Sequence, residues 1–134
     1  MYTVALVEDH PITSELLARS IGKCKGLKLV GVYDSGQEAL RDLPTKRPDV
    51  VLMDIKLPGM SGIDCVRALR SRSPAFKSPI LMLTEYAEEQ LIFDALKAGA
   101  NGYLLKNKER HQQVGEPRLR MGFAMHLATI AVAA

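Results

Sequence analysis

The sequence predicts an α/β domain with a doubly wound, five-stranded parallel sheet and helices on both faces. Five short, near-continuous apolar runs recur along the first 105 residues, and segments with helical apolar spacing separate them. Apolar runs of this length are typical of strands that are buried on both faces. Strands that alternate with helices in this way form an open parallel sheet.

The five apolar runs define the expected strands. They are Thr3–Val7, Leu29–Tyr33, Val50–Met53, Ile80–Leu83 and Gly102–Leu105. The intervening segments carry apolar stripes at helical spacing, namely Ile12–Ile21, Ala39–Leu43, Ile63–Leu69 and Leu91–Ala98. Asp34 or Ser35 is expected to cap the second helix, and Ser61 precedes the third. Gly99 suits the C-cap of the fourth.

Polar residues stand where four of the strands should end. They are Glu8 and Asp9, then Asp54, Thr84 and Lys106. In open parallel sheets the ligand lies beyond the carboxyl ends of the strands, near the point where strand order reverses. We therefore expect these side chains to share one crevice.

Composition favours a single cytoplasmic domain. The chain has 134 residues, 47% of them apolar and 25% charged, which fits one globular domain. Cys24 and Cys65 are too few for a disulfide framework, so reduced thiols are expected. Glu8 and Asp9 interrupt the first apolar run, so no signal peptide is expected. No apolar run reaches about 18 residues, so we expect no membrane partner.

The net charge is uneven along the chain. Residues 106–134 contain five Lys or Arg against two acidic residues, which accounts for the whole net charge of +3. This imbalance is too small to predict nucleic-acid binding by this chain.

The strand-end residues suit phosphoryl chemistry. Clustered carboxylates repel one another unless a cation joins them, and Mg²⁺ prefers such oxygen ligands. An ammonium and a hydroxyl suit an incoming phosphoryl group. A carboxylate can itself act as the nucleophile and form an aspartyl-phosphate.

Four segments resemble the receiver domains of two-component response regulators, whose fold is flavodoxin-like. Val4–Pro11 resembles their acidic opening, and Val51–Gly62 closely resembles the segment around their phosphoacceptor. Ile80–Thr84 resembles the strand that ends in the switch hydroxyl, and Ala98–Lys106 the strand that ends in the essential lysine. The motifs are similar to the branch that often carries a helix-turn-helix output domain, although we expect none in this sequence.

The resemblance implies a phosphoacceptor that receives its phosphoryl group on Asp54 from a histidine kinase, a phosphotransfer protein or a small phosphodonor. It implies Mg²⁺ held by Asp9, Asp54, the Lys56 backbone carbonyl and, through water, Glu8. It also implies that the phosphoryl group is bound by Thr84 and Lys106, and that Tyr103 changes rotamer with Thr84.

The resemblance also implies self-catalysed phosphoryl transfer and slow dephosphorylation, without a free-standing enzymatic activity. The residues two positions after Asp54 and Thr84, which flank the path of the hydrolytic water in the family, are here the large Lys56 and Tyr86.

Two features depart from the family pattern. Glu85 follows Thr84, where the family usually has a small residue, and a carboxylate there would crowd or repel an arriving phosphoryl group.

The second departure is the C-terminal segment, residues 107–134, which we separate from a receiver core of residues 1–106. Gly115 and Pro117 fall where the family's last helix normally runs. The segment is expected to form a loop followed by an apolar helix that starts at Pro117, and this helix would support a homodimer. A disordered or artificial tail is the alternative.

Three other functions remain open at this point. A receiver fold could serve only as a protein-binding module without phosphorylation. A nucleotide- or flavin-binding protein could share the fold class, although no Gly-rich loop follows the first strand. The basic tail could contact nucleic acid.

Overall fold

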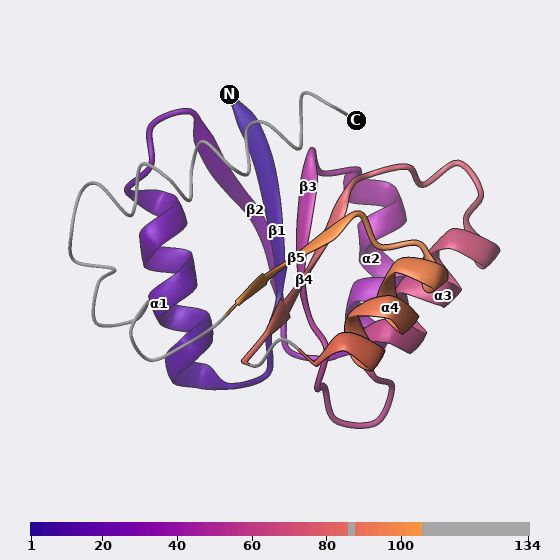
Figure 1. The fold of residues 1–134 in the computed structure, drawn as a ribbon. Helices are drawn as coiled ribbons and strands as arrows, with labels where there is room; N and C mark the ends of the chain where they lie inside the picture. Colours follow the sequence, from indigo (N-terminus) through magenta and orange to yellow (C-terminus); the bar gives the residue numbers. More distant parts are fainter. Residues whose placement is uncertain (86–87, 106–134) are drawn as a thin grey trace.

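A five-stranded parallel sheet organises the computed structural model, which describes residues 1–85 and 88–105 (Figure 1). The strands are β1 Tyr2–Val7, β2 Leu27–Tyr33, β3 Val50–Asp54, β4 Ile80–Thr84 and β5 Gly102–Leu105. The helices are α1 Pro11–Gly22, α2 Gly36–Lys46, α3 Gly62–Arg72 and α4 Glu89–Ala98. The strand order is β2-β1-β3-β4-β5, and every neighbouring pair is parallel. The predicted five-stranded parallel sheet is therefore confirmed.

Helices cover both faces of the sheet, as the apolar runs predicted. Figure 1 shows α1 on one side and α2, α3 and α4 on the other. Successive strand residues point to opposite faces. In β1, Val4 and Leu6 therefore join the core under α1, whereas Ala5 and Val7 join the core under α2 and α3. Because both faces are covered, the central strands need apolar residues at every position.

Several element boundaries confirm the local signals in the sequence. The Ser35 hydroxyl accepts a hydrogen bond from the Glu38 N–H. Of the two predicted N-cap residues, Asp34 and Ser35, Ser35 is therefore the N-cap of α2. Ser61 caps α3, and Gly99 is the C-cap of α4 with φ of 120°. The second strand begins at Leu27, two residues earlier than expected, because exposed Lys28 interrupts the apolar run on this edge strand.

Three sequence predictions fall outside the described residues. They concern Tyr86, Lys106 and the proposed loop and apolar helix of residues 107–134. Within residues 1–85 and 88–105, no helix has both the length and the apolar character needed to cross a bilayer.

Candidate functional site

The candidate site lies at the carboxyl edge of the sheet, where β1, β3 and β4 end. Glu8 and Asp9 follow the last residue of β1, and Asp54 and Thr84 are the last residues of β3 and β4. Strand order reverses beside β1, because β2 pairs with one side of it and β3 with the other. Glu8, Asp9, Asp54 and Thr84 therefore stand at the same edge of the sheet, beside the topological switch point where such folds bind ligands.

Three carboxylates form the centre of the site. One oxygen each from Glu8, Asp9 and Asp54 lies within 4.8 Å of the others. Glu8 is 1% exposed and Asp54 is 5% exposed, whereas Asp9 faces solvent. Like charges this close favour a bound cation, and an all-oxygen set suits a hard divalent ion such as Mg²⁺. The residues present therefore fit the metal that the sequence predicted.

Backbone hydrogen bonds fix the buried Glu8. Its N–H donates to the Tyr33 carbonyl at 2.9 Å, and its carboxylate accepts from the His10 N–H at 3.2 Å. The Tyr33 ring is buried and its hydroxyl donates to Asp42 in α2. Burial, together with this carboxylate, raises the pKa of the Tyr33 phenol, which favours its protonated, hydrogen-bond-donating form. The end of β2 is thereby tied to both α2 and the site.

Backbone N–H groups of the loop after β3 and of the start of α3 hold the end of β3 that carries Asp54. The Lys56 N–H donates to the Asp54 carboxylate at 3.2 Å, and the Gly62 N–H donates to the Ile55 carbonyl at 2.8 Å. A Cβ at Gly62 would lie 1.9 Å from the Asp54 carbonyl oxygen. Because that contact is with backbone, no side chain fits at Gly62 without moving the strand end that carries Asp54.

Thr84 stands opposite the end of β5. It is buried, and it pairs in register with Leu105, the residue that precedes Lys106 in the sequence. Lys106 itself lies outside the described residues, as does Tyr86. Tyr103 is 42% exposed on β5, and Glu85 is exposed directly after Thr84.

The structure thus brings together Glu8, Asp9 and Asp54, and it places Thr84 at the neighbouring strand end. Sequence reasoning missed two supporting elements, the Tyr33–Asp42 pair and the close approach of Gly62. The Tyr33–Asp42 pair had no local signal, and the Gly62 contact had only a weak one, since each depends on a partner from a different element. A glycine at the start of a helix directly after a Ser cap would have been the only hint of the second.

Comparison with known proteins identifies similar chains. A family model described as the response regulator receiver domain matches residues 4–114. The DNA-binding transcriptional activator DevR/DosR of Mycobacterium tuberculosis is 38% identical over 107 residues, which are 80% of this chain and 48% of that protein. The chain therefore spans about half the length of this curated relative.

Two solved structures have a similar fold. The signal receiver domain of the response regulator NarL from Mycobacterium tuberculosis has a TM-score of 0.81 at 26% identity, and the match covers 99% of this chain and 98% of that one. The receiver domain of sensor histidine kinase PA1611 from Pseudomonas aeruginosa has a TM-score of 0.76 at 25% identity. That match covers 97% of both chains, and that structure has a magnesium ion coordinated in its active site cleft.

Proposed function

The chain belongs to the family of response regulator receiver domains, and from that premise we propose that Asp54 is its phosphoacceptor in two-component signalling. The observation that carries the proposal is the position of Asp54. It is nearly buried at the end of β3, within 4.8 Å of two further carboxylate oxygens, and it follows strand residues that are themselves fully buried. This position favours a reactive residue over a helix cap or a solvated charge.

In the proposed reaction, a carboxylate oxygen of Asp54 attacks the phosphorus of the donor. A new P–O bond forms, and the P–N bond of a phosphohistidine, or the P–O bond of acetyl phosphate, breaks. The electron pair leaves with the imidazole or the acetate. The hydrogen bond from the Lys56 N–H to the Asp54 carboxylate keeps one oxygen occupied and so orients the other.

Asp9, Asp54, the Lys56 carbonyl and, through water, Glu8 would hold Mg²⁺. When bound, Mg²⁺ neutralises charge on the phosphoryl oxygens and on the crowded carboxylates. The carboxylates of Glu8, Asp9 and Asp54 supply the oxygen donors that such an ion needs. The related PA1611 receiver domain, with magnesium in its cleft, supports the same assignment here.

Lys106 and Thr84 would bind the phosphoryl oxygens, with Thr84 moving toward them and Tyr103 changing rotamer. Two observations support this: Thr84 ends β4 beside the β5 residue that precedes Lys106, and Tyr103 is partly exposed on β5. Phosphorylation would then bias the populations of two conformations, because the added charge is satisfied only in one of them.

The chain is not an enzyme in the usual sense, because the group that it acts on is its own side chain. We propose that it catalyses its own phosphoryl transfer and a slow dephosphorylation. Its donor would be a histidine kinase or a phosphotransfer protein. DNA binding, as in the name of the DevR/DosR relative, is not proposed for these residues, since the chain spans about half of that protein.

Intact-mass measurement with acetyl phosphate and Mg²⁺ tests the proposal. The wild type should gain one phosphoryl mass, Asp54→Asn should gain none, and the matched control Asp64→Asn, which changes an exposed aspartate on α3, should react as the wild type does. Asp9→Ala should react slowly and recover as Mg²⁺ is raised. An unchanged wild-type mass, under conditions in which a related receiver reacts, would favour the binding-only function.

We also propose homodimerisation through residues 107–134, on the apolar composition of Leu119–Val132. Light scattering on the full chain and on a chain that ends at Lys108 tests it. The full chain should have twice the monomer mass and the shortened chain the monomer mass. Two monomers of equal thermal stability would refute the proposal.

A further inference from the structure

Arg70, in the last turn of α3, reaches two loops at the edge of the sheet opposite the candidate site. Its Nε donates to the Gly99 carbonyl at 3.1 Å, at the C-terminal end of α4. Its Nη1 donates to the Phe76 carbonyl at 3.1 Å, in the connection between α3 and β4. Its Nη2 donates to the Asn101 side-chain oxygen at 3.0 Å, just before β5. One guanidinium therefore joins the C-terminal ends of α3 and α4 to the α3–β4 connection and to the residue before β5.

These contacts use the planar fork of arginine. All three acceptors are neutral oxygens, and the guanidinium also lies 5.7 Å from the centre of the Phe76 ring. A cation at the C-terminal end of a helix is stabilised by the helix dipole. A lysine ammonium is a point donor and cannot reproduce this planar set of bonds. This set of hydrogen bonds therefore requires an arginine at position 70 and not just a positive charge.

The neighbouring residues are fitted to this arrangement. A Cβ at Gly99 would lie 2.6 Å from the Arg70 Cγ, and Gly99 has φ of 120°, which disfavours any residue with a side chain. The Asn101 side-chain oxygen also accepts from the Ile80 N–H at 2.9 Å, and the Asn101 N–H donates to the Ile80 carbonyl at 2.8 Å. The C-terminal end of α4 and the starts of β4 and β5 therefore form one connected unit.

The other end of α4 is held differently. Glu88 is the N-cap residue, and no side-chain hydrogen bond caps the helix there among the described residues. Ala95, near the C-terminal end, is 1% exposed and is the buried residue of α4, whereas Phe93 is 56% exposed. By contrast, Ser35 and Ser61 cap α2 and α3. The first turn of α4 does pack against the core through the partly buried Leu91, but it has neither a side-chain cap nor a fully buried residue, so the helix is held more firmly at its C-terminal end.

We infer that Arg70 is an anchor that makes the C-terminal end of α4 a pivot, so that this helix moves at its N-terminal end. The N-terminal end of α4 is the end nearer to Thr84 along the chain, because Thr84 ends β4 and α4 is the next element. A displacement that begins at the carboxyl edge of the sheet reaches α4 first at its N-terminal end, which has no side-chain cap. The anchor exists without phosphorylation, so it can be tested on the resting protein.

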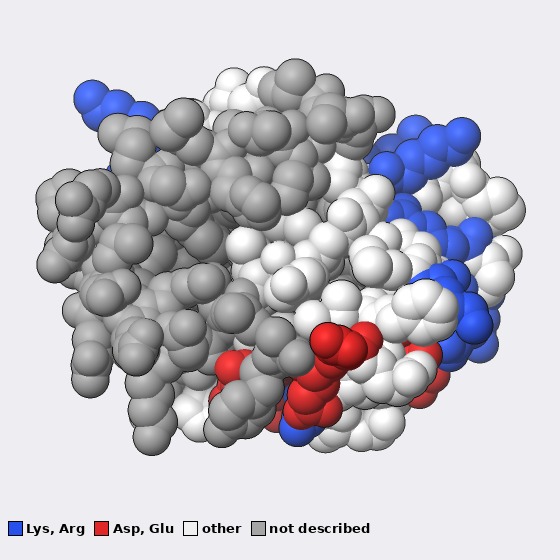
Figure 2. Space-filling model, viewed as in Figure 1, with Lys and Arg blue, Asp and Glu red and all other residues white. Residues whose placement is uncertain are grey.

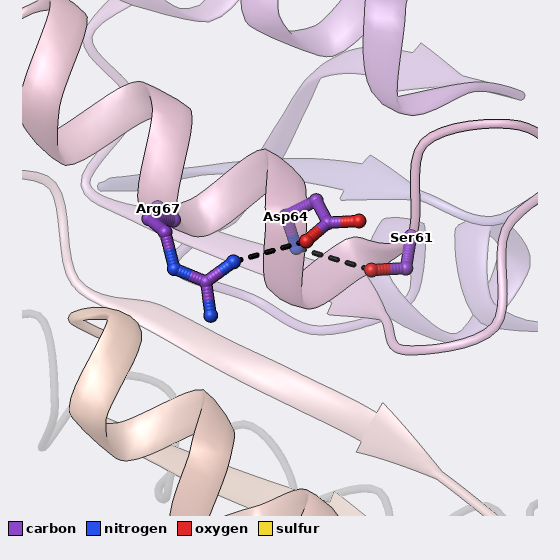
Figure 3. Close-up of polar contacts among 3 residues, drawn as sticks. All are labelled: Ser61, Asp64 and Arg67. Atoms are coloured by element: carbon purple, nitrogen blue, oxygen red, sulfur yellow. Dashed lines mark hydrogen bonds and ion pairs between the residues drawn. The ribbon is translucent and has the colours of Figure 1, made fainter.

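Arg67, one turn earlier on α3, provides a matched control. It donates to Asp64 at 3.0 Å within the same helix, and both side chains are exposed (Figure 3). Figure 2 shows Lys and Arg side chains gathered at the upper right, over the side where α3 and α4 lie, and acidic side chains toward the lower edge. Removing either arginine changes the net charge equally, but of the two only Arg70 bonds to residues outside its own helix.

Residue-resolved amide hydrogen exchange on the full chain tests the inference. In the wild type, the amides of Ala98–Asn101 should exchange more slowly than those of Ile92–Asp94. Arg70→Met should raise the exchange rate of Ala98–Asn101 about tenfold, which corresponds to about 1.4 kcal/mol. The rates of Ile92–Asp94 should change less than about twofold, and Arg67→Met should leave both segments as in the wild type.

Arg70→Lys keeps the positive charge but removes the planar guanidinium, so it tests the geometry separately from the charge. It also replaces Arg70→Met as the test if that variant does not fold. It should raise the exchange of Ala98–Asn101 nearly as much as Arg70→Met, because a lysine cannot reach both loops in one geometry. If Arg70→Lys leaves exchange at the wild-type rate, or if both methionine variants behave alike, the anchor is refuted. If Ile92–Asp94 exchange as slowly as Ala98–Asn101 in the wild type, the pivot is refuted.

Discussion

At the scale of single residues, Gly62 shows how closely the start of α3 packs against the backbone of Asp54. Gly62→Ala should destabilise the chain by about 1–3 kcal/mol or more, because the added Cβ meets the Asp54 carbonyl oxygen at 1.9 Å and the backbone must shift. Urea unfolding measures this cost. Gly22→Ala is the matched control, since nothing lies within 4 Å of a Cβ there and alanine favours the helix.

The same substitution should also slow phosphorylation by acetyl phosphate, because Asp54 is displaced from its position beside Glu8 and Asp9. A Gly62→Ala variant that unfolds at the wild-type urea concentration would show that the strand end can move freely. In that case the close approach would have no consequence for the site.

Lys56 and Tyr86 concern the lifetime of the phosphorylated state. We expect Lys56→Ala with Tyr86→Ala to lose its phosphoryl group several-fold faster than the wild type, because a water must reach a position in line with the breaking bond. Lys56 is an exposed side chain beside Asp54, and Tyr86 lies outside the described residues. Intact mass, followed over time after donor removal, measures the decay. Lys46→Ala, an exposed lysine on α2, is the control, and equal decay in all three proteins would exclude shielding.

At the scale of elements, the start of α3 depends on Ser61. Its hydroxyl accepts from the Asp64 N–H at 3.1 Å, and Figure 3 shows this bond beside the Arg67–Asp64 ion pair. Ser61→Ala should cost about 1 kcal/mol, because one first-turn N–H loses its acceptor. The shift of the urea midpoint measures it.

Ser71→Ala is the control within the same helix, because Ser71 is exposed near the C-terminal end. It should change stability by less than about 0.5 kcal/mol. If both serine variants shift the midpoint equally, the cap makes no special contribution. The ion pair between Arg67 and Asp64 is exposed, so it cannot substitute for the cap by more than a small amount.

The element scale also shows which local signals are reliable. Ser35, Ser61 and Gly99 marked helix ends correctly, because each acts through its own backbone neighbours. Pro44 falls inside α2, where a proline would usually be avoided. In this last turn the proline removes only the hydrogen bond to the Leu40 carbonyl, and the Arg47 N–H still closes the helix by donating to the Leu43 carbonyl at 2.9 Å.

At the scale of the whole molecule, the carboxylate cluster should link stability to divalent ions. Mg²⁺ should raise the unfolding temperature of the wild type, because an ion that binds only the folded state stabilises it by mass action. Asp9→Asn should be more stable than the wild type without Mg²⁺, by about 1 kcal/mol or less, because one of three neighbouring charges is removed. Its unfolding temperature should respond less to Mg²⁺.

Thermal unfolding with 0 and excess Mg²⁺ checks both statements. Glu15→Gln is the control, because Glu15 lies on α1 in an exposed ion pair with Arg19, away from the cluster. A wild type whose unfolding temperature does not change with Mg²⁺ would contradict the metal assignment. An Asp9→Asn variant that is less stable than the wild type without Mg²⁺ would contradict the charge-repulsion argument.

The sequence by itself determined the strands, the helix ends at Ser35, Ser61 and Gly99, and the residues at the strand ends. Buried strands need continuous apolar residues, and caps need particular side chains at one position, so both are visible locally. Asp54 could be singled out because it belongs to a set of polar residues at four strand ends, and because Val51–Gly62 resembles the phosphoacceptor segment of receiver domains.

Only the tertiary structure decided which of these residues meet, and what holds them. The 4.8 Å grouping of Glu8, Asp9 and Asp54 depends on β1 lying beside β3, which no local pattern specifies. The contact of Gly62 with Asp54 and the reach of Arg70 to Gly99 likewise join segments from different elements. Such contacts depend on the order and packing of the strands and helices, because proximity across a fold is a property of the assembled chain and not of any one stretch.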